Sequence, residues 1–93
     1  MLSQIPVKLE KVSKKHLDRE ILRVAVIAEL DAVSLYEQLA AATENEDIKK
    51  ILLDVAKEEK THVGEFQTLL LREDNQQVEE LEHGKEEVEE ILE

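Results

Sequence analysis

The sequence contains no cysteine and no tryptophan, and it has only one proline, two glycines and 2% aromatic residues. Without thiols the chain can form neither a disulfide framework nor a thiolate zinc site. The scarcity of glycine and proline leaves few positions for tight turns, and a composition rich in Glu, Leu, Val, Lys and Ala favours helices. With no apolar leader after Met1, these 93 residues predict one small all-α domain in a reducing cytosol.

Basic residues are also in short supply, because 12 Lys and Arg stand against 23 Asp and Glu, for a net charge of −11. This charge repels nucleic acid and anionic membranes, whereas it raises the local concentration of cations. The sequence also lacks an apolar run long enough to span a membrane. We therefore expect neither a nucleic-acid partner nor a membrane partner. Positively charged metal ions are compatible with the negative electrostatic potential of the chain.

Hydrophobic periodicity divides the domain, residues 1–93, into an arm and three helical segments. The predicted elements are an N-terminal arm, two long helices that form an antiparallel hairpin, and a short C-terminal helix, at residues 1–12, 14–42, 46–72 and 76–93. Ser13 is the expected N-cap of the first long helix, and Thr43 with Glu46 has the spacing of a capping box for the second. Gly84 is the expected break in the last segment.

Each long helix has a row of residues along one face, which we call its seam, that is apolar except at a few polar positions. In the second helix, steps of four and three residues lead from Val55 through Glu59 and His62 to Phe66. In the first helix the same rhythm passes through Glu29, between Val26 and Val33. An antiparallel hairpin would therefore bring Glu29 level with Glu59 and His62.

Burying an ionised carboxylate costs several kcal/mol unless a positive charge offsets it. A bound cation would best offset this cost for the carboxylates of the two seams. Glu59 and His62 are separated by three positions, so both can reach one ion from a single helix face. Di-iron and di-manganese bundles use one Glu from each of two helices and Glu-x-x-His from each of the other two. This chain supplies half of that set, so we expect a homodimer that forms a four-helix bundle around two ions. Iron suits redox chemistry, and manganese is the alternative.

Other interpretations of these residues stay open at this stage. Glu-x-x-His occurs by chance on many exposed helices, and Glu29, Glu59 and His62 could form a hydrogen-bonded cluster without metal. Tyr36, two turns beyond Glu29, could support the site or be an ordinary core tyrosine. Three further acidic residues are either solvated surface or a weak path for cations, namely Asp31, Glu58 and Glu65. We expect the remaining histidines, His16 and His83, to be ordinary exposed residues.

Two segments also resemble a known family, the encapsulated ferritins. They are IAELDAVSLYEQ, within residues 26–38, and KEEKTH, residues 57–62, with 30 positions between Glu29 and Glu59. The similarity covers residues 17–92. It implies a two-helix hairpin with a short C-terminal helix, dimers that build a ferroxidase centre, and an open ring, commonly of ten chains. It further implies Glu29, Glu59 and His62 as iron ligands, with Tyr36 beside them.

The resemblance also implies a place of action inside an encapsulin nanocompartment in the cytoplasm, reached by a C-terminal docking peptide or by fusion to the shell protein. The final residues, KEEVEEILE, look like neither a docking peptide nor a linker, which favours the domain of a fusion. The sequence departs from the family at Leu35, where tryptophan is usual, and at Ala28, where an acidic residue is usual. Iron access is therefore expected to differ.

The resulting hypothesis is a ferroxidase that oxidises Fe(II) with dioxygen or peroxide for iron mineralisation and storage. A rubrerythrin-like peroxidase is the nearest enzymatic alternative. The alternative from another class is a metal-free helical oligomerisation module in which the polar seam residues fix the register.

Overall fold

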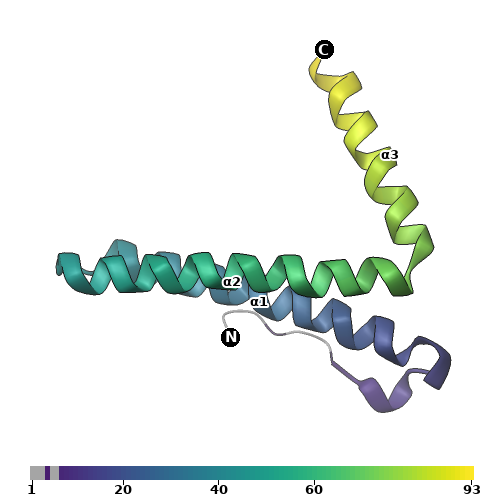
Figure 1. Ribbon diagram of the computed structural model, residues 1–93, viewed down its shortest axis with the longest axis horizontal. Coiled ribbons are helices and arrows are strands. Elements are labelled where there is room, and N and C mark those ends of the chain that lie inside the picture. The colour runs from purple at the N-terminus through teal and green to yellow at the C-terminus, as the bar shows by residue number, and fades with distance from the viewer. Residues whose placement is uncertain (1–3, 5–6) are drawn as a thin grey trace.

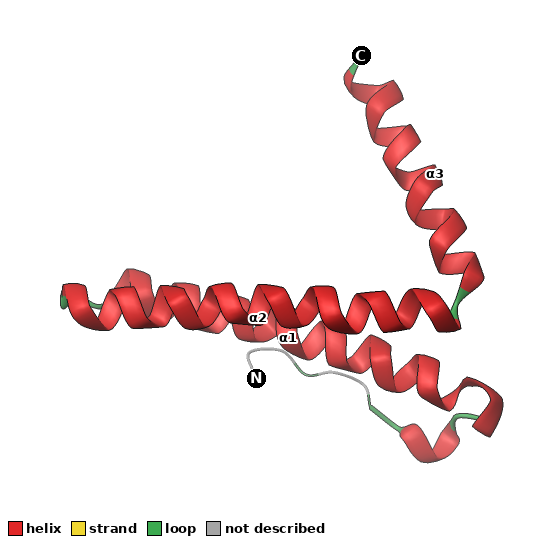
Figure 2. Cartoon of the chain, viewed as in Figure 1, coloured by secondary structure: helices red, strands yellow, loops and turns green. Residues whose placement is uncertain are grey.

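A computed structural model describes Gln4 and residues 7–93, and this part of the chain consists of helices and short connections (Figures 1 and 2). The elements, in chain order, are η1 (Leu9–Lys11), η2 (Lys14–His16), α1 (Leu17–Ala42), α2 (Glu46–Glu73) and α3 (Asn75–Leu92). The described residues contain no strand, which confirms the all-α prediction. None of the described helices has both the length and the apolar character needed to cross a membrane.

Helices α1 and α2 run side by side in opposite directions and form the predicted hairpin (Figure 1). Between them lies a small core of four buried apolar residues, Val33, Ala40, Ala56 and Leu70. Two of these are alanines, and their short side chains allow the backbones of α1 and α2 to approach closely. Fourteen large hydrophobic side chains of the described residues stay 42–80% exposed, which is extensive apolar surface for a domain of this size.

The first long helix begins three residues later than predicted. Residues 14–16 form the 3-10 segment η2, and α1 starts at Leu17. Ser13 precedes η2 in an extended conformation and its side chain makes no capping hydrogen bond, so its assignment as the N-cap of the long helix is wrong. Of the predicted arm, residues 1–3, 5 and 6 lie outside the described part, and Leu9–Lys11 forms η1.

The start of α2 differs from the predicted capping box. Asn45 is the N-cap, and its Oδ1 accepts hydrogen bonds from the backbone N–H groups of Asp47, at 3.0 Å, and Ile48, at 3.1 Å. Thr43 instead ends α1, and its hydroxyl oxygen accepts a hydrogen bond from the Asn45 N–H at 3.1 Å. Asparagine and threonine are both good caps, so the local sequence alone did not separate them.

The predicted break at Gly84 is absent, since α3 continues from Asn75 to Leu92 without interruption. A glycine inside a helix costs about 1 kcal/mol relative to alanine, which is too little to divide a helix of several turns. The apolar side chains of α3 therefore lie along one continuous helix.

Asp74 connects α3 to the rest of the fold. Its Oδ1 caps α3 by accepting a hydrogen bond from the Gln77 N–H at 3.1 Å, and its Oδ2 accepts one from the Arg23 guanidinium of α1 at 2.8 Å. Only 7% of this residue is exposed. Because the carboxylate is bonded to both helices, it fixes the direction in which α3 leaves the hairpin (Figure 1).

The double role of Asp74 gives a testable dependence of stability on pH. The backbone hydrogen bond from Gln77, and after it the hydrogen bond and the charge of Arg23, outweigh the effect of burial and lower the pKa of Asp74. A lowered folded-state pKa stabilises the fold above the unfolded-state pKa, and this contribution is lost as pH falls through the folded-state value. We expect Asp74→Asn, which keeps a capping oxygen, to lower the melting temperature at about pH 7 and to match the parent near pH 2. Thermal circular dichroism measures this, and an equal difference at both pH values would contradict it.

Candidate metal centre

Glu29 of α1 meets Glu59 and His62 of α2 midway along the hairpin. The Nδ1 atom of His62 lies 3.3 Å from Oε2 of Glu59 and 3.4 Å from Oε2 of Glu29. One potential ligand atom from each residue lies within 4.8 Å of the others. The shared period of the two seams and the antiparallel direction of the helices produce this meeting, as the sequence predicted.

The three side chains perturb each other's protonation. The hydrogen bond with Glu59, with partial burial and the like charge of that residue, raises the pKa of Glu29. The same hydrogen bond lowers the pKa of Glu59. Hydrogen bonding to Glu59 and the charges of both carboxylates raise the pKa of His62. The cluster therefore concentrates negative charge that protons partly neutralise, and a cation can take the place of those protons.

The donor set fits a hard or borderline divalent ion such as Fe(II) or Mn(II), since it offers carboxylate oxygens and one imidazole nitrogen. The Glu29 and Glu59 side chains are 21% and 19% exposed, and the His62 side chain is 44% exposed. The cluster is thus partly covered by the hairpin and open on the side of His62. Three protein ligands leave coordination positions for a second chain or for solvent.

Exposed hydrophobic residues flank this open side at both ends of the hairpin. On α2, Ile51 and Leu69 lie within about 20° of His62 around the helix axis, and they are 66% and 44% exposed. On α1, Ile21 and Leu39 share one side of the helix and are 43% and 45% exposed. We define these four residues with His62 as the metal face. The metal face thus combines exposed apolar side chains with one residue of the cluster of Glu29, Glu59 and His62.

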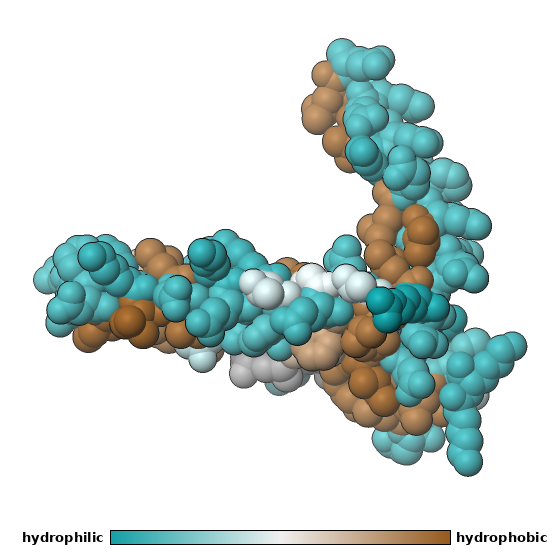
Figure 3. Space-filling model, viewed as in Figure 1, coloured by the Kyte–Doolittle hydropathy of each residue, from teal (hydrophilic) through white to brown (hydrophobic). Residues whose placement is uncertain are grey.

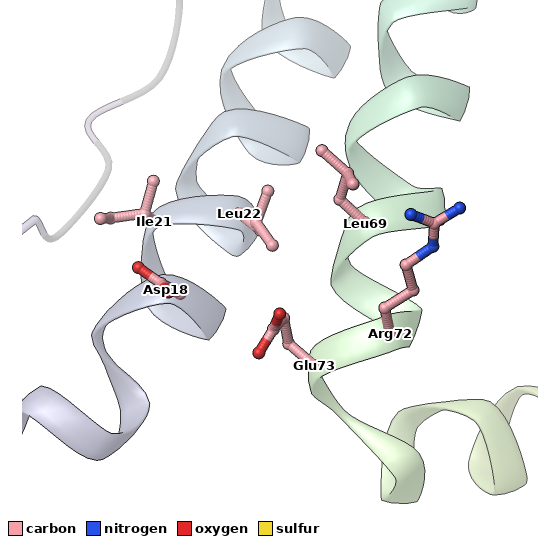
Figure 4. Close-up of a pocket in the computed structure, with 6 residues that line it drawn as sticks. All are labelled: Asp18, Ile21, Leu22, Leu69, Arg72 and Glu73. Carbon is pink, nitrogen blue, oxygen red and sulfur yellow. The ribbon is translucent and has the colours of Figure 1, made fainter.

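One end of the metal face is hollowed into a groove of about 320 Å³ between the start of α1 and the end of α2 (Figure 4). Leu22 and Leu69 point toward one another across it, whereas Arg72 extends away from the space between the helices (Figure 4). The groove is lined by Asp18, Ile21, Leu22, Leu69, Arg72 and Glu73. Its apolar floor and charged rim resemble one end of an unoccupied helix-packing surface.

The other predicted site residues lie outside the cluster. Tyr36 is half-buried on α1, seven positions beyond Glu29, or about 10 Å along the helix axis. Asp31 is half-buried, and Glu58 and Glu65 are exposed on α2. The structure therefore brings together Glu29, Glu59 and His62, and the parts assigned to the remaining residues stay predictions.

Sequence reasoning missed an ion pair beside the cluster. The Nζ of Lys60 lies 3.0 Å from Oε2 of Glu37, so the residue after Glu59 connects α2 to α1. Both side chains are about half exposed, at 59% and 48%, so this pair contributes little to stability on its own. The pair connects the two helices one residue beyond Glu59. No local pattern signals such a pair, because the residues are 23 positions apart.

The fold and the cluster define a class of ferritin-like carboxylate proteins, and comparisons with known proteins agree. Residues 20–92 match the Rubrerythrin family. The chain is 64% identical over 72 residues to the ferritin-like-encapsulin shell fusion protein of Pyrococcus furiosus, covering 77% of this chain and 21% of that protein. It is 42% identical over 81 residues to the encapsulin nanocompartment cargo protein EncC of Myxococcus xanthus, covering 84% of this chain and 60% of that one.

A solved structure supports the same assignment. The crystal structure of the encapsulated ferritin domain from Pyrococcus furiosus superposes with a TM-score of 0.82 at 55% identity, and the match covers 97% of this chain and 94% of that one. The chain belongs to the rubrerythrin family of ferritin-like proteins and is an encapsulated ferritin domain. It spans about a fifth of the Pyrococcus fusion protein and 60% of the Myxococcus cargo protein.

Proposed function

We propose that this domain is a ferroxidase that oxidises Fe(II) to Fe(III) at a centre completed by a second copy of the chain. The observation that supports this most directly is the meeting of Glu29, Glu59 and His62 on the exposed metal face. Two such faces, related by a twofold axis, contain four carboxylates and two imidazoles, which is the donor set for a pair of iron ions. In this proposal the dimers assemble further into a ring.

The reaction proposed here balances with iron as the substrate. Two Fe(II) ions each lose one electron, and dioxygen takes up both electrons and two protons to become hydrogen peroxide. The carboxylates of Glu29 and Glu59 favour the product because they stabilise the higher charge of Fe(III). His62 supplies the nitrogen ligand, and Tyr36 is proposed to border the centre from the next turns of α1.

The proposed cellular setting is an encapsulin nanocompartment in the cytoplasm, where the shell retains the ferric product for mineralisation and storage. This rests on the two relatives, one of which is named as a shell fusion protein and the other as a nanocompartment cargo protein. Fusion to the shell and co-assembly with it are the two routes that these names suggest.

Anaerobic iron loading tests the shared centre. A site divided between chains binds the dimer better than the monomer, so Fe(II) should shift the chain to a larger species and bind at about one ion per chain. Analytical ultracentrifugation with bound-iron analysis measures both effects, and dioxygen added afterwards should produce ferric absorbance. If no Fe(II) binds, the ferroxidase proposal fails. If iron binds with no change in sedimentation, the site lies within one chain.

A rubrerythrin-like peroxidase is the second candidate, and the match to the Rubrerythrin family over residues 20–92 favours it. The oxidant separates the two candidates. A ferroxidase oxidises bound Fe(II) rapidly with dioxygen, whereas a peroxidase reacts much faster with hydrogen peroxide and turns over when a reductant is supplied. Stopped-flow oxidation with each oxidant at equal concentration distinguishes them.

A further inference from the structure

The two ends of the hairpin differ in how they are held together. At one end residues 43–45 connect α1 to α2, and at the other, which we call the open end, α1 begins and α2 ends (Figure 1). Of the four buried apolar residues in the described part of the chain, three lie between the cluster of candidate ligands and the connection, namely Val33, Ala40 and Ala56. Leu70 lies on the side of the open end. Buried apolar contacts therefore hold the helices together mainly on the connected side.

Apolar packing leaves the open end incompletely closed. The groove of about 320 Å³ separates the start of α1 from the end of α2, with Leu22 and Leu69 on opposite sides of it (Figure 4). Hydrophobic residues also stay at the surface around this end of the hairpin (Figure 3). At the cluster itself, Glu29 and Glu59 repel each other whenever both are ionised. A contact other than apolar packing must therefore keep the two helices at a fixed separation.

A short polar bond supplies this contact. Nη2 of Arg23 on α1 lies 2.8 Å from Oδ2 of Asp74, the residue that follows α2, and Asp74 is 7% exposed. Both partners are oriented by a second interaction. Nη1 of Arg23 lies 3.5 Å from Oε2 of Glu20, and Oδ1 of Asp74 accepts a hydrogen bond from the Gln77 N–H at 3.1 Å. A charged bond that is short, partly buried and held from both sides contributes more than a flexible surface ion pair.

The position of this bond allows it to act on the candidate ligands. Val33 is the buried residue of α1 that lies nearest to the cluster on the connected side. Along the helix axis, Val33 is about 6 Å from Glu29 and about 15 Å from Arg23. If α1 pivots at Val33 as a rigid rod, Glu29 moves by about 40% of the displacement at Arg23. An extra separation of about 2 Å at the open end would then exceed the tolerance of about 0.2 Å in metal–ligand distances.

We propose that Arg23 and Asp74 are positioning residues for the metal centre, because their bond closes the open end of the hairpin. The bond keeps Glu29 of α1 within reach of Glu59 and His62 of α2. Neither Arg23 nor Asp74 belongs to the cluster. The inference rests on the metal centre of the proposed function, but it concerns the binding of the ion and does not depend on the oxidant or the reaction.

The first test compares two variants with two matched controls, at a temperature where circular dichroism shows all of them folded. Arg23→Gln and Asp74→Asn break the bond, and Asp74→Asn keeps an oxygen that can cap α3. Lys60→Gln and Glu37→Gln change the net charge in the same two directions and break a second interhelical ion pair, which is about half exposed. Anaerobic titration with Co(II), used as a spectroscopic probe in place of Fe(II), measures the dissociation constant and the visible absorption of the bound ion.

We expect the dissociation constant for Co(II) to rise about fivefold in Arg23→Gln and in Asp74→Asn. The visible spectrum of bound Co(II) should change with it, because the ligands are displaced. The two controls should stay within about twofold of the parent and keep its spectrum. A lower melting temperature with parental Co(II) affinity and spectrum in both variants would show that the bond serves only the fold, and the proposal would be overturned. Equal losses of affinity in the variants and the controls would overturn it as well.

The double variant Arg23→Gln/Asp74→Asn tests whether the two residues act through their common bond. The bond is already lost when either partner is replaced, so the double variant should bind Co(II) about as weakly as the weaker of the single variants. Losses that multiply in the double variant would mean that the two residues act separately, and they would exclude the bond as the cause.

Hydrogen exchange in the metal-free chain keeps this test separate from the proposed function. We expect the backbone amides of residues 21–28 to exchange faster in Arg23→Gln and Asp74→Asn than in the controls, while those of residues 33–40 keep the parental rate. Exchange of residues 21–28 that matches the controls would overturn the proposal. If the parent binds no metal, the ferroxidase proposal fails, and the exchange rates alone decide whether the bond closes the open end. If the parent binds Co(II) but does not oxidise iron, a loss of affinity in the two variants still supports the positioning role.

Discussion

Replacing Glu59 or His62 with alanine is expected to abolish Fe(II) binding and oxidation while α1 and α2 stay folded. Loss of a residue that merely orients a metal ligand costs about 10–100-fold in affinity, so loss of a ligand should exceed about 100-fold. The buried apolar core lies outside the cluster, and the hydrogen bond with Glu59, partial burial and the like charge of that residue all raise the pKa of Glu29. Glu59→Ala should therefore keep or slightly raise the melting temperature. Ferric absorbance and circular dichroism measure the two quantities.

The chain contains its own control for this experiment. Glu80 and His83 repeat the Glu-x-x-His spacing on α3, with the His83 Nδ1 atom 3.3 Å from the Glu80 carboxylate. Both side chains are exposed, and among the described residues only Glu29, Glu59 and His62 form a group of three that could hold a metal ion. Glu80→Ala and His83→Ala should keep parental oxidation. Activity within about threefold of the parent in Glu59→Ala or His62→Ala would reject the ligand assignment.

The meeting of the three candidate ligands could be predicted because it follows from short-range periodicity. The repeat of four and three residues places Glu29 and Glu59 in the seams of their helices, and an antiparallel hairpin then determines which turns are level. The structure confirms that these side chains converge with His62. Their part as iron ligands stays a prediction, as does the part of Tyr36.

The direction of α3 could not be predicted in this way. It depends on the bond between Arg23 and Asp74, which are 51 positions apart and leave no periodic signal. The ends of the helices could not be predicted from the sequence either, because Asn45 and Thr43 are both good caps and only the structure shows that Asn45 caps α2. Gly84 was misread for a related reason, because the small cost of a helical glycine is offset by the hydrogen bonds of the surrounding turns.

A second large effect is expected in iron storage, which should be low for this chain without a shell. A ferritin retains mineral because its subunits enclose a cavity, whereas this hairpin with a projecting α3 is an extended unit of 47 × 44 × 20 Å. In the open ring proposed above, the dimers built through the metal face would enclose no cavity. Ferric ions released from the centre therefore enter bulk water, where they hydrolyse and precipitate.

The storage prediction is tested by adding Fe(II) aerobically in large excess over the chain and measuring the iron that elutes with protein on gel filtration. We expect retained iron to level off near the capacity of the ligand sites, about one ion per chain, while further iron precipitates. Glu59→Ala provides the baseline, because it should retain none at the centre and form precipitate only at the rate of uncatalysed oxidation. Co-expression with an encapsulin shell protein should convert the precipitate into soluble, protein-associated iron. Retention far above the site capacity by the chain alone would mean that its copies close into a cage, and the open-assembly proposal would then be discarded.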